Sequence, residues 1–380
     1  MEVVTEEQIL EALKSVNDPE IKRPITELGM VDGVLIDGND ITVKLLLTVS
    51  GCPLKDTLNR DITAAVATVA PASVVTVDMG VMTDEQRKSM QEMLRGGRTE
   101  REIPFAQAGS LTKVYAIASG KGGVGKSSVT VNLALAMAQR GLKVGIIDAD
   151  IYGHSIPDML GVGDARPTQV EDMIMPVPVK GMKVISVGML KPRKDQVVAW
   201  RGPMLDRALV QMLSDVFWGD LDALLLDLPP GTGDVAISLG QHLPNAEVVV
   251  VTTPQSAAAS VAERAGTMAS MMHQRVVGVI ENMSYLQLPG SEERHEIFGS
   301  GGAEKVATAL SAKFGYDVPL LAQIPLDEKL RIGGDNGIPI IESEPDSVAA
   351  KELQGVADKL SGRSRGLAGM QLGLAPAGRL

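Results

Sequence analysis

The residue types from position 120 to 127 could bind the phosphate groups of a nucleotide. They read Gly120, Lys121, Gly122, Gly123, Val124, Gly125, Lys126 and Ser127, which fits the pattern G-x-x-x-x-G-K-[ST], and Ser128 follows directly. The glycines allow successive backbone N–H groups to converge on phosphate oxygens at the start of a helix, where the helix dipole favours negative charge. The segment therefore predicts a nucleotide-binding P-loop.

The same glycines also fit G-x-G-x-x-G, a weaker pattern that is typical of dinucleotide-binding folds. Asp148 lies 23 residues beyond Gly125, where such a fold places the acid that binds the ribose. Two residues favour the P-loop, because Lys126 supplies a cation for the β- and γ-phosphates and Ser127 supplies a hydroxyl for Mg²⁺. The additional Lys121 also favours the P-loop. A dinucleotide site and an unliganded glycine turn are the alternatives.

A carboxylate at the end of another apolar run supports the P-loop. Residues 224–234 read L-L-L-D-L-P-P-G-T-G-D, so Asp227 ends a predicted strand in the manner of a Walker B aspartate. The expected chemistry is ATP hydrolysis by in-line attack of water, stabilised by Mg²⁺ and lysines and without a covalent enzyme intermediate. Sites of this kind often act as slow switches.

The residues from Lys121 to Ser127 resemble the deviant Walker A motif of the MinD/ParA/NifH class of P-loop ATPases. Three further segments narrow the resemblance to the Mrp/ApbC family of iron–sulfur cluster carriers. They are D-A-D-I-Y-G-H-S-I-P at 148–157, D-L-P-P-G-T-G-D at 227–234 and E-N-M-S at 281–284. The resemblance covers about residues 113–345.

This resemblance implies a role for each matching catalytic residue. Lys126 would bind the β- and γ-phosphates, and Lys121 would reach across a homodimer to the partner's nucleotide. Ser127 and Asp227 would hold Mg²⁺, with Asp227 acting through a water molecule. Asp150 would orient the attacking water. The plainer interpretation of Asp148 and Asp150 is that they are ordinary carboxylates at the end of a strand.

The resemblance also implies a site for the adenine base. Asn282 would recognise the base, and residues 324–327, which include Pro325, would close over it. Asn282 could instead cap a turn, because asparagine serves turns readily. His154 lies close in sequence to Asp150, in the segment we call the switch segment (148–157). We interpret His154 as a surface or packing residue, since no set of metal ligands accompanies it.

The N-terminal region resembles the small iron–sulfur assembly domain of SufT- and PaaD-like proteins. The matching motifs are D-P-E at 18–20, P-I-T-E-L-G-M-V at 24–31 and L-T-V-S-G-C-P-L at 47–54. In that family the cysteine equivalent to Cys52 opens a helix, and a helix N-terminus can lower the pKa of a thiol. Cys52 is thus a candidate cluster or thiol site, and a buried, inert cysteine is the alternative.

The cysteine pair that Mrp-type carriers use for a bridging cluster is missing. Their C-P-x-C motif follows N-M-S-[YW], but here Leu288 and Ser291 occupy the cysteine positions and only Pro289 is retained. Iron–sulfur clusters normally need four thiolates, whereas a dimer of this chain could offer at most two, the two copies of Cys52. The alternative is that the chain acts on a partner that holds the cluster. The acidic residues and His295 that follow predict a solvated, charged hairpin.

Apolar periodicity predicts the elements that position these residues. A helix near 6–15, strands at 30–36, 41–48 and 73–79, and a helix near 54–69 predict a small α+β domain. Beyond 113, β-branched runs alternate with helical stretches, at 114–119, 144–147, 184–187, 223–228, 248–252 and 276–280. This alternation predicts an α/β P-loop fold with a mostly parallel sheet covered on both faces. We predict domains at 1–92 and 113–362, a linker at 93–112 and a disordered tail at 363–380.

Charge and composition restrict the function further. The net charge is −11 and the pI is about 5.0, which disfavours nonspecific binding to nucleic acid or anionic lipid. The lack of a signal-peptide pattern and of a long apolar run predicts a cytoplasmic protein. We predict an ATP-dependent iron–sulfur cluster carrier or assembly protein that acts as a homodimer on apoproteins. The alternatives are a MinD/ParA-like positioning ATPase and an ATP-dependent scaffold that holds no cluster itself.

Overall fold

The chain folds into two compact units in the computed structural model. The described residues are 4–19, 21, 23–48, 55–95, 102–107, 109–151, 153–171, 173–191, 202–288, 290 and 293–362. The first unit consists of Met1–Glu102, Pro167–Pro176 and Asp215–Gly219, and the second consists of Ile103–Arg166, Val177–Ser214 and Asp220–Leu380. The tail predicted at 363–380 lies outside the described residues, and the finer domain bounds stay predictions.

The first unit packs its first two helices against a small sheet. Its elements are α1 (Glu6–Leu13), β1 (Val31–Asp37), β2 (Asp40–Leu47), α2 (Lys55–Val69), β3 (Val74–Val81) and α3 (Asp84–Arg95). The strand order is β1-β2-β3, with β1 antiparallel and β3 parallel to β2. Burial alternates along β2, so that Ile41, Val43 and Leu45 face the core. The α+β prediction for this region is confirmed.

Two distant segments of the chain belong to this first unit. The strands β6 (Thr168–Val170) and β7 (Met173–Met175) form a hairpin whose residues Val170, Met173 and Met175 join the same apolar core. Residues 215–219 pair with this hairpin, since Ile174 N donates to Asp215 O at 2.8 Å. Sequence periodicity alone placed both segments with the P-loop region.

The second unit is built on an eight-stranded sheet in the order β15-β12-β11-β4-β10-β5-β9-β8, in which only β8 runs antiparallel to its neighbour. Its strands are β4 (Lys113–Ser119), β5 (Val144–Asp148), β8 (Val177–Val179), β9 (Met182–Ser186), β10 (Ala223–Asp227), β11 (Glu247–Thr252), β12 (Arg275–Glu281) and β15 (Leu320–Gln323). The six strands predicted in this region are present to within two residues, whereas β8 and β15 were not predicted.

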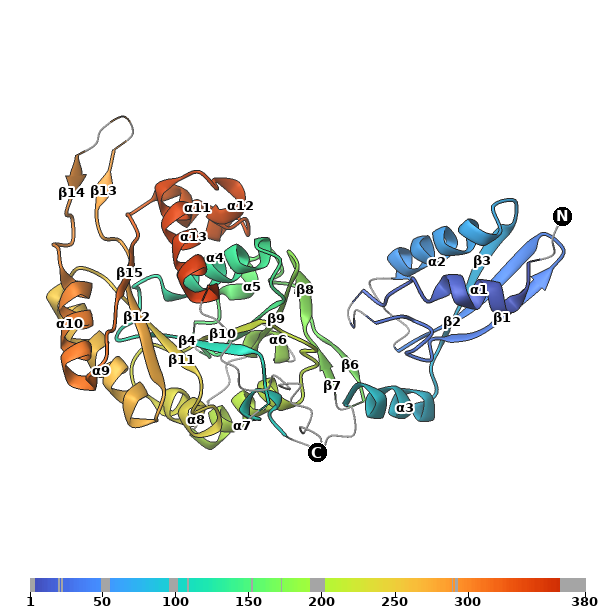
Figure 1. The fold of residues 1–380 in the computed structure, drawn as a ribbon, viewed down its shortest axis with the longest axis horizontal. Coiled ribbons are helices and arrows are strands. Elements are labelled where there is room, and N and C mark those ends of the chain that lie inside the picture. The colour runs from blue at the N-terminus through green and yellow to red at the C-terminus, as the bar shows by residue number, and fades with distance from the viewer. Residues whose placement is uncertain are drawn as a thin grey trace, which may run out of the picture. The chain divides into compact units, whose positions relative to one another are not determined.

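Helices cover both faces of this sheet (Figure 1). One layer contains α4 (Lys126–Gln139), α5 (Ile156–Met159), α11 (Glu328–Asp335), α12 (Ile340–Ser343) and α13 (Val348–Ser361). The other contains α7 (Gly202–Ser214), α8 (Asp234–His242), α9 (Ser256–Met271) and α10 (Gly302–Phe314). The short elements are η1 (Pro104–Ala106), α6 (Val187–Leu190), β13 (Leu286–Gln287) and β14 (Arg294–His295). The predicted α/β fold with a mostly parallel, doubly covered sheet is confirmed.

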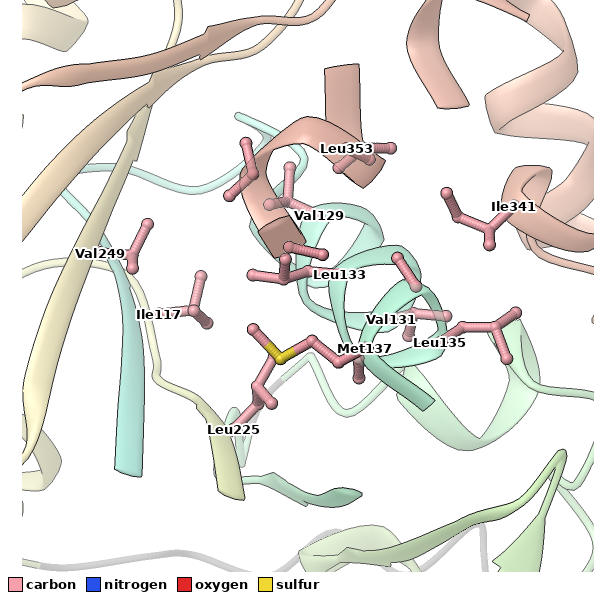
Figure 2. Packing of buried hydrophobic residues seen from close by; sticks show 14 of the residues in the cluster. Ile117, Val129, Val131, Leu133, Leu135, Met137, Leu225, Val249, Ile341 and Leu353 are labelled. Carbon is pink, nitrogen blue, oxygen red and sulfur yellow. The ribbon is translucent and has the colours of Figure 1, made fainter. Parts of the chain in front are cut away.

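The P-loop helix α4 lies at the centre of this unit. Its residues Val129, Leu133 and Met137 are buried, and Figure 2 shows α4 between the strands that carry Ile117 and Leu225 and other helices. A helix that is apolar on nearly all sides is stable only when it is enclosed in this way. Its start is therefore held rigidly at the carboxyl ends of β4 and β10.

Among the described residues, no helix is long and apolar enough to cross a membrane.

Candidate active site

The loop between β4 and α4 has the backbone geometry of an anion cradle. Gly123 and Gly125 have positive φ angles of 80° and 82°, a region that favours glycine. A Cβ atom on Gly125 would also lie 2.2 Å from Asn282 Nδ2. Substitution at Gly125 is thus disfavoured both by its backbone conformation and by a neighbouring side chain. The loop is open toward a cavity of about 240 Å³.

The cavity collects the residues that the P-loop pattern predicted. All residues from 121 to 128 line it, and Asp150 and Pro230 contribute from the loops after β5 and β10. Parallel strands end at the same edge of a sheet, so these loops converge although they are far apart in sequence. Ser155 also lines the cavity, and sequence reasoning had given it no role.

The Asp227 carboxylate is the centre of the polar network below this cavity. It is fully buried, and its Oδ2 accepts hydrogen bonds from Lys126 Nζ and Ser127 Oγ, each at 2.6 Å. Its Oδ1 accepts a hydrogen bond from Thr130 Oγ1 at 2.7 Å. Lys126 Nζ also lies 3.6 Å from Asp150 Oδ2. The structure therefore brings together the predicted phosphate lysine, magnesium serine, Walker B aspartate and switch aspartate.

Asp148 anchors the segment that carries Asp150. Its carboxyl group accepts hydrogen bonds from Asp150 N at 3.2 Å, Ile156 N at 3.3 Å and Ser186 Oγ at 3.1 Å. Burial, together with the neighbouring Asp227 carboxylate, raises the pKa of Asp148 well above its usual value. Asp148 thus fixes the backbone of the segment that carries Asp150. Asp148 is not one of the described residues that line the cavity.

On the other side of the P-loop, Asn282 presents an unused acceptor. The side chain is buried, and its Nδ2 donates to Val124 O at 2.9 Å. Its Oδ1 is buried as well, and no donor among the described residues reaches it. Leaving such an oxygen unpaired costs about 1–3 kcal/mol, so a donor from a ligand would be favoured there. Pro325 is buried and follows Ile324, whose N–H donates to Glu281 O at 2.7 Å.

The signature lysine is held within its own chain. Lys121 Nζ donates to Gln255 Oε1 at 2.8 Å, next to the start of α9. Its role in a partner subunit stays a prediction. His154 Nε2 lies 3.0 Å from Lys191 Nζ, and the His154 ring packs beside Gly188, in accord with a packing role.

The predicted cluster positions are only partly described. Cys52, Pro289 and Ser291 lie outside the described residues. Leu288 follows β13 in the β13–β14 hairpin and is half exposed, and this hairpin corresponds to the charged hairpin that was predicted. Among the described residues, no group of three or more His, Cys, Asp or Glu side chains could hold a metal ion.

Sequence reasoning missed three contacts of the site. Thr130 lies one helical turn after Lys126, a spacing that places both near Asp227 and could have been recognised. Gln255, which binds Lys121 134 residues away, carried no signal, and Glu281 was noted only as part of the E-N-M-S motif, because its partners Ala303 and Gln323 are distant in the sequence.

The fold and the site together define a P-loop nucleoside triphosphatase. Residues 110–361 match the family described as NUBPL iron-transfer P-loop NTPase, and residues 6–79 match the family described as iron–sulfur cluster assembly protein. The chain belongs to the NUBPL iron-transfer P-loop NTPase family. The predicted enzyme class, a P-loop ATPase, is thereby confirmed, as is the predicted family resemblance.

Known relatives match almost the whole chain. A protein named iron–sulfur cluster carrier protein from Mycobacterium tuberculosis is 58% identical over 370 residues, covering 97% of this chain and 96% of the relative. A protein of the same name from Synechocystis is 40% identical, covering 95% and 98%. A nucleotide-binding protein from Archaeoglobus fulgidus, solved with ADP, is 36% identical with a TM-score of 0.53, covering 70% of this chain and 95% of its own.

Proposed function

We propose that this chain is an ATP-hydrolysing carrier of iron–sulfur clusters that delivers them to apoproteins. The observation that supports it most is the hydrogen-bonded network of Lys126, Ser127 and the buried Asp227 below the P-loop cavity. Relatives that match the chain over nearly its full length carry the name iron–sulfur cluster carrier protein. Clusters are cargo in this proposal, and ATP is the substrate.

The residues of the cavity fit Mg-ATP. Lys126 is neutralised by Asp227 in this structure, and triphosphate oxygens would compete for its ammonium group. Ser127 and Asp227 offer the hydroxyl and carboxylate oxygens that Mg²⁺ prefers, and the bound ion would neutralise charge on the phosphates. Asp150 lines the same cavity and would orient the attacking water. Asn282 Oδ1 would accept a hydrogen bond from the amino group of adenine.

Homodimerisation belongs to the same proposal. Lys121 lies at the cavity, and among the described residues its ammonium group makes one hydrogen bond, to the neutral side chain of Gln255. Exchanging that neutral acceptor for phosphate oxygens would be favourable, because hydrogen bonds between ionised groups are stronger. Those phosphates would be the partner's, as the family resemblance implies.

The cargo site needs an experiment of its own, because the usual cysteines are replaced by Leu288 and Ser291. Wild type, Cys52→Ala and Leu288→Cys/Ser291→Cys would be reconstituted anaerobically, and iron and sulfide would be counted per dimer. We expect a weak, labile cluster or none in wild type, none in Cys52→Ala and a stable bridging cluster in the double variant.

The same three proteins distinguish a chain that carries the cluster itself from a scaffold that holds no cluster. A wild type that takes up no iron but still stimulates transfer from a loaded partner protein would support the scaffold, which the single cysteine favours. A stable, stoichiometric cluster that survives Cys52→Ala would contradict both the proposed ligand and the proposed labile state.

A further inference from the structure

Glu281, the last residue of β12, is a buried carboxylate that the proposed catalytic chemistry does not use. Its side chain accepts three hydrogen bonds: from Ser284 Oγ at 2.5 Å, from Gln323 Nε2 at 3.0 Å and from Ala303 N at 2.9 Å. No ion pair found among the described residues includes it. A buried carboxylate without a cation is costly unless donors satisfy its oxygens, so Glu281 requires these three donors to stay in place.

Two of the three donors come from segments beside the predicted base site. Ser284 ends the turn that begins with Asn282, and Gln323 ends β15 directly before residues 324–327. The backbone joins the same segments, since Ser284 N donates to Ile324 O at 2.9 Å. Glu281 therefore fixes the turn that carries Asn282 against the segment predicted to close over the base.

The third donor, Ala303 N, connects Glu281 to the start of α10, which follows the β13–β14 hairpin in sequence. The hairpin lies in sequence between Ser284, two residues before β13, and Ala303, eight residues after β14, so residues on both sides of it bond to the same carboxylate. The hairpin stands out from the body of the second unit beyond β12 and β15 (Figure 1). Its first end also bonds to the base segment, because Leu326 N donates to Tyr285 O at 2.7 Å.

We propose that Glu281 is a positioning residue that couples occupancy of the base site to the β13–β14 hairpin. The inference rests on the proposed function, because it requires that adenine binds at Asn282. A donor from the base to Asn282 Oδ1 fixes the turn, and Ser284 and Glu281 pass this constraint to the segments that precede and follow the hairpin. Nucleotide binding then restrains strands β13 and β14.

The test compares Glu281→Gln and Ser284→Ala with wild type and with Glu304→Gln as a control. Glu304 is an exposed glutamate in the first turn of α10, one residue after Ala303. Calorimetry measures the affinities for ADP and for inosine diphosphate, which lacks the amino group. Hydrogen exchange measures protection of β13 and β14 with and without ADP.

We expect Glu281→Gln to weaken ADP binding about tenfold and inosine diphosphate binding much less, because the phosphate contacts are unchanged. Protection of the hairpin by ADP disappears in this variant. Ser284→Ala, which keeps the buried charge, shows a smaller effect in the same direction and carries the test if Glu281→Gln does not fold. Glu304→Gln behaves as wild type.

If Glu281 only stabilised the fold, both variants would have a lower melting temperature than wild type. The ratio of the affinities for ADP and inosine diphosphate and the ADP-dependent protection would then be unchanged. That result overturns the inference. Failure of the proposed function is distinguishable, because wild type itself would then bind neither nucleotide.

Discussion

The ammonium group of Lys126 interacts with two carboxylates, and this predicts the effect of its removal. Lys126→Ala should lower ATP hydrolysis by at least about a hundredfold, because the cation fixed among the P-loop amides is lost. A hydrolysis assay with a matched Lys143→Ala control, an exposed lysine before β5, measures this. Near-normal turnover of Lys126→Ala would remove the P-loop assignment.

Asp148 should make stability depend on pH in a defined direction. Because its pKa is raised in the folded state, the folded chain binds a proton that the unfolded chain has already released above its usual pKa of 3.8. The contribution of Asp148 to the free energy of unfolding therefore falls as pH rises from about 4 through its raised folded value.

Denaturation of wild type and Asp148→Asn across this pH range measures the effect. The stability of wild type relative to the variant should decrease with rising pH, and the difference should level off below about pH 4. A difference that stays constant with pH would show that Asp148 is not shifted as its burial beside Asp227 requires.

At the scale of elements, α7 and α8 are joined by one carboxylate. Asp206 Oδ1 of α7 accepts hydrogen bonds from Ser238 Oγ at 2.5 Å and pairs with His242 Nε2 at 2.9 Å, both on α8. These contacts, that of Ser238 first, lower the pKa of Asp206. The helix α8 begins at Asp234, the end of the loop that starts with Asp227, so the contact supports this loop.

Asp206→Ala should lower the free energy of unfolding by about 0.5–1 kcal/mol, a small value because the carboxylate is 47% exposed and screened by water. Since the folded pKa is lowered, this stabilisation is fully present above the usual pKa of 3.8 and is lost as pH falls through the folded value. Urea denaturation at several pH values measures it, with exposed Asp220→Ala as the control. Equal stability losses in the two variants would contradict the role of the contact.

At the scale of the whole molecule, shared active sites predict complementation between defective subunits. Lys121→Ala and Asp150→Ala should each bind nucleotide and hydrolyse it slowly, while an equal mixture should recover about a quarter of wild-type activity. Half of the randomly formed dimers are mixed, and each mixed dimer has one site with both residues intact.

The mixing experiment needs subunits that exchange, so the proteins would be mixed before ATP is added. Gln255→Ala serves as a reference, because it releases Lys121 from its own chain without removing the ammonium group. No recovery on mixing, together with single chains in sedimentation with ATP, would contradict the shared site.

The sequence by itself determined those features that local chemistry controls. The glycines and the Lys126–Ser127 pair specify the P-loop through short-range backbone geometry, and apolar runs specify the parallel strands, of which β10 ends at Asp227 and β5 ends two residues before Asp150. The four-residue strand β15 and the short antiparallel β8 were missed, because strands this short have too few residues to show a period.

Only the tertiary structure decided which distant side chains meet. The partners of Glu281 lie up to 42 residues away, and Lys121 and its acceptor Gln255 are 134 residues apart. The β6–β7 hairpin likewise joins the core of the first unit although the chain around it belongs to the second. Burial and hydrogen bonding in three dimensions select these contacts, and periodicity along the chain carries no information about them.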